Sequence, residues 1–252
     1  MHRLRATTEE LARTRPALSP EAARHLKVVR PKDGEAVELF DGCGATRVFT
    51  YDARTKELAA AAPVRTFPPR AARVTLFACV TKGARWDWTI EKATELGVAR
   101  IVPVLSERTI VRIDDAAERA AKRARWQKIA EEAARQSDAV WLPEIAAPVT
   151  FAAALAQVKE TTCFVGALTE PKSPPLLTAV ERSLADAART DLALFVGPEG
   201  DFTPAELAAL VAAAVPTSFG DTVLRAETAA IYGLTVLTAA LDAAHTQGGN
   251  AG

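Results

Sequence analysis

The alternation of apolar and polar residues before residue 70 predicts short strands joined by turns. Strands are expected over 35–40, 45–51 and 57–64, with a hairpin turn at Asp41–Gly42 between the first two. A short helix is expected through His25 to Val29, because Ser19 is a typical N-cap and Pro20 suits the first helical position. Residues 1–70 are therefore predicted to form a small β-rich domain that includes one helix.

A change of pattern marks the end of this domain. The segment that holds Pro63, Pro68 and Pro69 has neither a helical nor a strand period, and we interpret it as a linker that ends near residue 70. Beyond it, apolar runs of strand length alternate with helical patterns, which predicts a parallel α/β domain over 71–252. Strands are expected at 74–80, 101–105, 163–168, 192–196 and near Ser218, and helices at 86–96, 116–136, from 204 and from 226 to 244.

The ends of these helices carry recognisable signals. Gly97 follows the helix at 86–96 in the usual C-terminal position, and Asp115 with Glu118 forms a capping box before the long helix. The firmest boundary lies at Thr203, because Thr203 can cap, Pro204 suits the first helical position and Glu206 can reach back.

Composition and cysteine use narrow the class of protein. Of the 252 residues, 49% are hydrophobic, which is enough for a large core, and no apolar run reaches the roughly 20 residues that a membrane helix needs. The first residues lead into Thr-Glu-Glu instead of an apolar signal core, so we expect a cytoplasmic protein without a membrane partner. Cys43, Cys79 and Cys163 are far apart and lack metal-ligand spacing, which predicts small buried thiols and no metal site.

Charge is distributed unevenly although the formal net charge is zero. Residues 1–32 hold eight basic and three acidic side chains, whereas residues 171–252 hold four basic and nine acidic ones. An N-terminal basic face suits contact with phosphates, and clustering by chance on a solvated surface is the alternative.

Two loops near the C-terminus carry the candidate chemistry. Gly197 and Gly200 bracket Pro198–Glu199 at the end of a buried strand, where missing side chains allow a flat heterocycle such as adenine to lie against the backbone. A tight turn without a ligand is the alternative. No phosphate-binding glycine motif follows a strand, which disfavours ATP and NAD.

The second loop leads into the last predicted helix through Leu224-Arg225-Ala226-Glu227. Glu227 in a first turn suits the helix dipole and needs no ligand to explain it, whereas a cation at Arg225 opposes the dipole. That unfavourable placement indicates that Arg225 serves an anionic or electron-rich partner.

Further short motifs accompany these two loops along nearly the whole chain. They are His25–Arg30, Phe40–Gly42, Lys82, Lys92–Val98, Arg108, Glu132–Ala133 with Gln136–Ser137, and Pro143, followed by Gly197–Gly200 and Leu224–Ala229. In this order they resemble the bacterial 16S ribosomal RNA uridine N3-methyltransferases, the RsmE-type family of the SPOUT superfamily.

The resemblance implies a PUA-like RNA-binding β-barrel domain over 1–70 and a SPOUT-type α/β trefoil-knot methyltransferase domain over 71–252. It implies a homodimer that binds S-adenosyl-L-methionine (SAM) in the knot and methylates a uridine near the decoding region of the small ribosomal subunit. By position, the cofactor-binding residues are Leu168, Gly197, Pro198, Glu199, Gly200, Phe219, Gly220, Val223 and Leu224.

Site roles follow from the same resemblance and from the chemistry of uracil. Attack by uracil N3 requires loss of its proton, so Arg225 is expected to hold the uracil oxygens, and Glu227 either accepts the proton or orients Arg225. The candidates for RNA phosphate contacts are Arg3, His25, Arg30, Lys82 and Arg108. For His25, packing within its helix is the alternative.

The chain departs from the family pattern in a few places. Asp201 stands where a second glycine is usual, Phe219 where leucine is common, and Asp138–Ala139 where an arginine is frequent. The RNA or subunit contact expected of that arginine is either absent or supplied by Arg135. Two other functions stay open: a non-catalytic RNA-binding ribosome-assembly factor, and a knotted methyltransferase acting on ribose 2′-hydroxyls or on transfer RNA.

Overall fold

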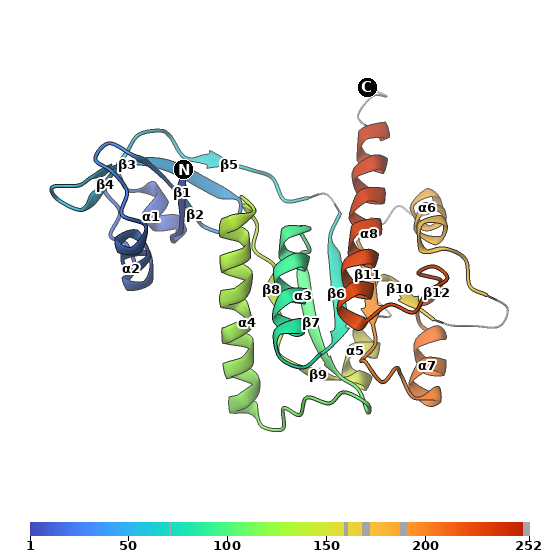
Figure 1. Cartoon of the computed structure of the whole chain (residues 1–252). Coiled ribbons are helices and arrows are strands. Elements are labelled where there is room, and N and C mark those ends of the chain that lie inside the picture. Colours follow the sequence, from blue (N-terminus) through green and yellow to red (C-terminus); the bar gives the residue numbers. More distant parts are fainter. Residues whose placement is uncertain (71, 159–160, 168–171, 187–190, 249–252) are drawn as a thin grey trace. The chain divides into compact units, whose positions relative to one another are not determined.

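The computed structural model of the chain describes residues 1–70, 72–158, 161–167, 172–186 and 191–248 (Figure 1). Its contacts divide into two compact units. The first unit contains residues 1–70 and also residues 131–142, and the second contains the rest. The sequence indicates a boundary near residue 70 but shows no sign that a later segment contributes to the first unit.

The first unit is built on a five-stranded sheet in which β2 and β3 are central. The strand order is β1 (His2–Arg5), β2 (Ala36–Phe40), β3 (Ala45–Asp52) and β4 (Glu57–Ala60), and β5 (Arg65–Thr66) also pairs with β3. β1 runs parallel to β2, and the other pairs are antiparallel. The helices are α1 (Thr8–Ala12) and α2 (Pro20–Val29), and Ser19 caps α2 as the sequence predicts.

The turn between β2 and β3 confirms the predicted hairpin and extends it to four residues. Gly42 and Gly44 both have positive φ, at 65° and 93°, which suits glycine. Buried Asp41 accepts hydrogen bonds of 2.8 Å from the backbone N–H groups of Cys43 and Ala45. Burial raises the pKa of Asp41, but these hydrogen bonds and one from Thr8 outweigh it, so the pKa lies below the usual value.

Four elements of the first unit differ from the sequence expectation. β1 and α1 lie in a segment for which no element was predicted, and β5 lies inside the predicted linker. The predicted strand at 57–64 ends at Ala60. β1 and β5 are short strands whose extended form depends on pairing with β2 and β3, which local pattern does not show.

The second unit is an α/β fold around a parallel sheet, as predicted. The sheet order is β12 (Val215–Thr217), β10 (Thr162–Gly166), β11 (Leu192–Val196), β6 (Val74–Cys79), β7 (Arg100–Leu105) and β8 (Glu144–Ile145), and β9 (Val149–Thr150) also pairs with β7. Every pair in it is parallel.

The helices of this unit are α3 (Ala84–Glu95), α4 (Ala116–Gln136), α5 (Phe151–Val158), α6 (Leu176–Asp186), α7 (Pro204–Val211) and α8 (Ala226–Gly248). The predicted capping box at Thr203 and Glu206 is present at the start of α7. α5, α6, β8 and β9 were not predicted. The helix α8 runs along β11 and β6 next to α3 (Figure 1).

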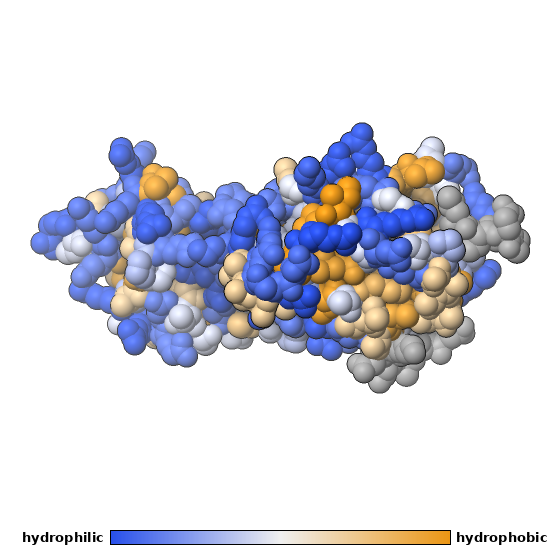
Figure 2. All heavy atoms as spheres, turned by 90° about the horizontal axis from the view of Figure 1, so that it is seen from below, coloured by the Kyte–Doolittle hydropathy of each residue, from blue (hydrophilic) through white to orange (hydrophobic). Residues whose placement is uncertain are grey.

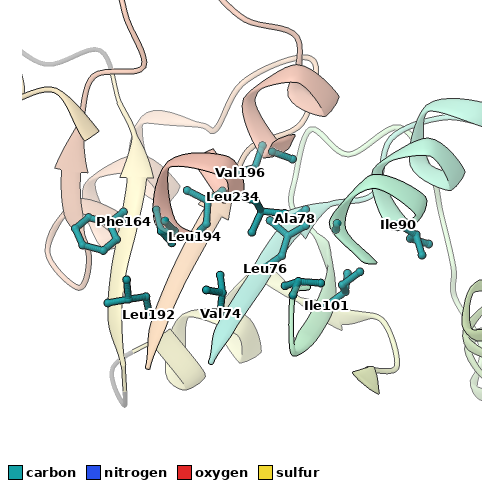
Figure 3. Packing of buried hydrophobic residues seen from close by; sticks show 14 of the residues in the cluster. Val74, Leu76, Ala78, Ile90, Ile101, Phe164, Leu192, Leu194, Val196 and Leu234 are labelled. Atoms are coloured by element: carbon teal, nitrogen blue, oxygen red, sulfur yellow. The ribbon is translucent and has the colours of Figure 1, made fainter. Parts of the chain in front are cut away.

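The core of the second unit lies on both faces of the sheet, which explains the continuous apolar runs in its strands. On β6, Leu76 and Ala78 face one cluster, while Phe77 and Cys79 face another. Figure 3 shows the first cluster, where Leu194 of β11 and Leu234 of α8 meet the β6 side chains. Side chains of α3, α4, α6 and α8 complete this cluster, and those of α5 and α7 complete the other.

The cysteines are free, and two of the three are buried as predicted. Burial raises the pKa of Cys79 to about 12 and raises that of Cys163, so both thiols stay protonated. Cys43 is exposed, which corrects the expectation of a buried thiol, because it lies in the turn between β2 and β3. Within the described residues, no helix is long and apolar enough to cross a membrane. The same residues include no group of three or more His, Cys, Asp or Glu side chains that could hold a metal ion.

Candidate functional site

A cavity of about 530 Å³ lies at the carboxyl ends of β10, β11 and β12. Parallel sheets present their ligand sites at this edge. The structure brings both candidate loops together around the cavity, and the predicted residues that line it are Gly197, Pro198, Glu199, Phe219, Gly220, Val223, Leu224 and Arg225.

Two predicted site residues among those described, Gly200 and Glu227, are not part of this wall. The carbonyl oxygen of Gly200 accepts a 3.0 Å hydrogen bond from Arg108 Nη1. Glu227 lies one residue beyond Ala226, which is the wall residue at the start of α8. Leu168 lies outside the described residues.

The loop after β11 and the start of α7 are held by hydrogen bonds from one segment, the residues that follow β7. Arg108 Nη1 donates to the carbonyl oxygens of Gly200 and Phe202, and the backbone N–H of Glu107 donates to Glu206 Oε1 at 2.9 Å. Asp201 has a φ of 59°, and the amide of Asp201 donates to the carbonyl of Pro198. Aspartate tolerates this left-handed conformation better than most residues, which explains how it replaces the family's glycine here.

The ring of Phe219 forms another part of the wall. A Cβ at Gly166 would lie 2.9 Å from Phe219 Cε2, so only glycine lets the Phe219 ring lie against the end of β10. The Phe219 ring in turn contacts Tyr232 of α8, with ring centroids 5.6 Å apart. Phenylalanine in place of the usual leucine therefore has a packing role between β10 and α8.

The loop after β12 is open to solvent. Gly220 has a φ of 119°, and a Cβ there would meet nothing within 4 Å. Lys172 forms an exposed ion pair with Asp221, and the side chain of Val223 is 88% exposed. The exposed Arg225 directly precedes α8. Its carbonyl oxygen accepts a hydrogen bond from the backbone N–H of Ala229, in the first turn of that helix.

A cavity residue that the sequence reasoning missed is Arg85, in the first turn of α3. Arg85 Nη1 lies 3.5 Å from Glu199 Oε1, and Arg85 Nε lies 3.8 Å from Glu227 Oε1. The described residues include no ion pair between Glu227 and Arg225. The signal that would have found Arg85 is the one used for Arg225, because a cation in a first helical turn opposes the dipole.

Arg3 is buried, which overturns its role as a phosphate contact. Its side chain is 4% exposed, its Nε lies 2.7 Å from Glu38 Oε2, and its Nη1 donates to the carbonyl oxygens of Ala134 and Ala139. The guanidinium also lies over the Phe40 ring, 4.2 Å from its centroid. Arg3 therefore ties residues 131–142 to the sheet of the first unit and has no surface to offer RNA.

His25 is half-buried within the first unit, and its Nδ1 accepts a 3.0 Å hydrogen bond from Arg135 Nη1. Burial, followed by the charge of Arg135, lowers the pKa of His25. Arg135 also pairs with Glu132, so the side chain expected to replace the family's arginine is engaged inside this unit.

The other candidates for RNA contact are exposed. Arg30 ends α2 with a φ of 50°. Lys82 follows β6, at the edge of the sheet that carries the cavity. Arg108 is exposed as well but donates to the Gly200 loop, so it has a structural role in addition to any contact with RNA.

The fold and site define an α/β protein with a small-molecule cavity at the carboxyl edge of a parallel sheet. Residues 68–238 match the model of the RNA methyltransferase domain, and the chain belongs to this family.

Individual relatives agree with this membership. The chain is 34% identical over 171 residues to a ribosomal RNA small subunit methyltransferase E of Synechocystis sp., an alignment that covers 67% of this chain and 54% of the relative. The chain therefore spans about half the length of that relative. It is 33% identical over 224 residues to a protein of the same name from Mycobacterium bovis, with 86% and 84% covered.

A solved structure matches almost the whole chain. It is a ribosomal RNA small subunit methyltransferase E from Neisseria gonorrhoeae bound to S-adenosyl methionine. The TM-score is 0.78 at 27% identity, and the match covers 95% of this chain and 97% of the other.

Proposed function

We propose that this chain is a SAM-dependent methyltransferase that methylates N3 of a uridine in 16S ribosomal RNA, near the decoding region of the small subunit. The observation that carries the proposal is the single cavity wall to which both C-terminal loops and Arg225 contribute. Membership of the RNA methyltransferase domain family supports the reaction class, and the names of the relatives support the ribosomal RNA substrate.

The cavity fits SAM in size and lining. Its volume of about 530 Å³ lies within the range of small-molecule sites. At Gly220 a side chain would project into open space, so this loop exposes bare backbone. At Gly197 a Cβ would lie 3.0 Å from the Phe202 ring, so glycine is needed there for close packing beneath the wall. The backbone and apolar side chains of Gly197–Pro198, Phe219–Gly220 and Val223–Leu224 would hold the adenine and methionine parts.

Bound SAM supplies an activated methyl group on a positively charged sulfur. What the protein itself must do is bring uracil N3 to that group and favour loss of the N3 proton. The negative charge that remains spreads over the two uracil oxygens. Arg225, exposed at the cavity wall, is proposed to bind one of these oxygens and so stabilise the charge as it develops.

The RNA phosphates are proposed to contact surfaces outside the cavity. Arg30, Lys82 and Arg108 are exposed and suited to phosphate contacts, whereas His25 is suited to a hydrogen bond from Nε2, because its Nδ1 is engaged by Arg135. We propose that the first unit acts as a PUA-like RNA-binding module, and that the chain after β12 threads a trefoil knot as it enters α8. The protein is proposed to act in the cytoplasm.

A homodimer is part of the proposal because the second unit exposes large apolar side chains. Trp88 of α3, Tyr232 of α8 and Val223 are all more than a third exposed. Figure 2 shows orange apolar side chains collected over this unit, between blue polar ones. Exposed apolar surface of this kind is typical of subunit contacts.

The test uses small ribosomal subunits from cells that lack this protein, incubated with the purified chain and SAM labelled in its methyl group. Label is expected in N3-methyluridine, and the Arg225→Ala variant is expected to lose about 100-fold in rate while its Kd for SAM is unchanged. Label in a ribose would favour the 2′-O-methyltransferase instead. Absence of label, together with no heat of SAM binding in calorimetry, would favour a non-catalytic assembly factor.

A further inference from the structure

Arg85 joins three segments of the second unit through one side chain. It belongs to α3, which follows β6, while its two carboxylate neighbours Glu199 and Glu227 follow β11 and β12. The distances of 3.5 and 3.8 Å make these ion pairs longer than hydrogen bonds. The N–H groups of the guanidinium therefore keep the capacity to donate to a ligand.

The position of Arg85 is unfavourable for the helix on which it lies. α3 begins after Gly83, which has no side chain to cap the first turn, and a cation in that turn opposes the helix dipole. The side chain of Arg85 remains 50% exposed and lines the cavity. The charge of Arg85 is unfavourable for the helix dipole, yet the side chain is held by two carboxylates and faces a cavity. A role in binding a ligand explains this placement better than a role in stability.

Glu227 lies behind Arg85 and does not line the cavity. Its side chain is 12% exposed, and its buried Oε2 has no hydrogen-bond partner among the described residues. The cavity wall includes Arg85, Glu199 and Arg225 but not Glu227. Glu227 can therefore act on the contents of the cavity through the guanidinium beside it.

We propose that Arg85 is a second substrate-binding guanidinium, which binds one uracil oxygen while Arg225 binds the other. This inference rests on the proposed function, and it names the site for the target base. Uracil N3 lies between two carbonyl groups, so two cations that face one cavity match the two oxygens on which the charge develops. Glu227 and Glu199 hold Arg85 in place.

The proton balance is simple and needs no additional reactant. The N3–H bond breaks, the proton passes to water, and the electron pair left on N3 forms the new bond to the methyl carbon. The carbon–sulfur bond of the methyl donor breaks in the same step, and its electron pair stays on the sulfur, which leaves as a neutral thioether. Arg85 and Arg225 stay charged throughout, because guanidinium groups do not lose their proton in proteins. The other charged groups at the cavity are Glu199 and Asp201 in its wall, with Glu227 behind Arg85.

The experiment compares Arg85→Met, Arg85→Lys and a matched control, Arg73→Met. Arg73 forms an exposed ion pair with Asp191 at 3.0 Å, at the amino end of β6 and so at the opposite edge of the sheet from the cavity. Arg85→Met is expected to lower kcat on the small subunit about 100-fold while calorimetry gives the wild-type Kd for SAM. The kcat of Arg85→Lys is expected to lie between those of Arg85→Met and the wild type, and the kcat of Arg73→Met is expected to equal that of the wild type.

Two further readouts separate substrate binding from a merely structural role. Raising the pH should recover more of the rate of Arg85→Met than of the wild type, because alkali removes the N3 proton without help from a cation. Glu227→Gln should lower kcat less than Arg85→Met, and the double variant should be no slower than Arg85→Met alone.

The outcomes are distinct for the two proposals. A wild-type chain that transfers no methyl group to uridine refutes the proposed function, whatever Arg85 does. An active wild type with an equally active Arg85→Met variant refutes this inference alone. Loss of SAM binding in Arg85→Met would also refute it, because Arg85 would then serve the cofactor and not the uracil. Fully additive effects of the Arg85 and Glu227 substitutions would refute it as well, because Glu227 would then not act through Arg85.

Discussion

Gly233 of α8 lies directly against Leu194 of β11, so closely that a Cβ on Gly233 would be 2.5 Å from Leu194 Cδ2. Gly233 is buried, and Leu194 lies in the interior contact between α8 and the central strands, where Figure 3 shows it beside Leu234. The same helix begins at the cavity, where Arg225 precedes its first residue and Glu227 lies in its first turn.

Gly233→Ala is therefore expected to destabilise the chain by about 1–3 kcal/mol, since the new methyl group overpacks a buried contact. The free energy of unfolding in urea measures this. Thr235→Ala, an exposed change two residues along the same helix, should stay within about 0.5 kcal/mol of the wild type. Adding Leu194→Ala to Gly233→Ala should give a less than additive loss, and full additivity would contradict the contact.

Arg3→Met is expected to destabilise the first unit by about 3–5 kcal/mol, because it leaves the largely buried Glu38 carboxylate without its partner. Denaturant unfolding measures the loss. Arg15→Met is a matched control, since Arg15 pairs with Glu57 in an exposed ion pair whose loss should cost less than about 1 kcal/mol.

The same pair of variants tests the correction made for Arg3. If Arg3 bound phosphate, Arg3→Met would reduce the salt dependence of RNA binding in molecules that remain folded. We expect that dependence to be unchanged, and a shallower slope would restore Arg3 as an RNA contact.

Arg108→Met is expected to weaken SAM binding about fivefold, or about 1 kcal/mol, because the loop at Gly200 and Phe202 loses its donor. Calorimetry with SAM measures the change. An unchanged Kd for SAM together with weaker, less salt-dependent RNA binding would show that the phosphate contact is the main role of Arg108. Lys82→Met, which alters an exposed cation outside this loop, serves as the control for SAM binding and should leave the Kd for SAM unchanged.

The pH dependence of stability should reveal His25. Its pKa in the folded chain is lowered by burial and by Arg135, so the unfolded chain takes up a proton at a higher pH than the folded chain does. Its contribution to stability is therefore complete above the ordinary value of 6.5 and is lost as the pH falls through that value.

Melting temperatures between pH 5 and pH 7.5 measure this effect. His25→Gln keeps an acceptor for Arg135 but does not titrate, and it should flatten the profile. An unaltered slope in His25→Gln would place the acid-sensitive group elsewhere.

Local signals were sufficient for many of the elements. Continuous apolar runs predict β6 and β11 because both faces of these strands are covered. Caps at Ser19 and Thr203 predict the starts of α2 and α7 because a cap is formed by residues three apart. Short strands such as β1 and β5 escaped prediction because their partners are distant in sequence.

By itself, the sequence determined the parallel α/β class, the two C-terminal loops and the anomalous cation at Arg225, because these depend on residue type and short spacing. Only the tertiary structure decided that Arg3 is buried beneath residues 131–142 and that Arg85 lies between Glu199 and Glu227. Each of these depends on segments that are far apart along the chain and that are brought together by packing. The burial and the partners that give a charged side chain its role exist only once that packing is complete.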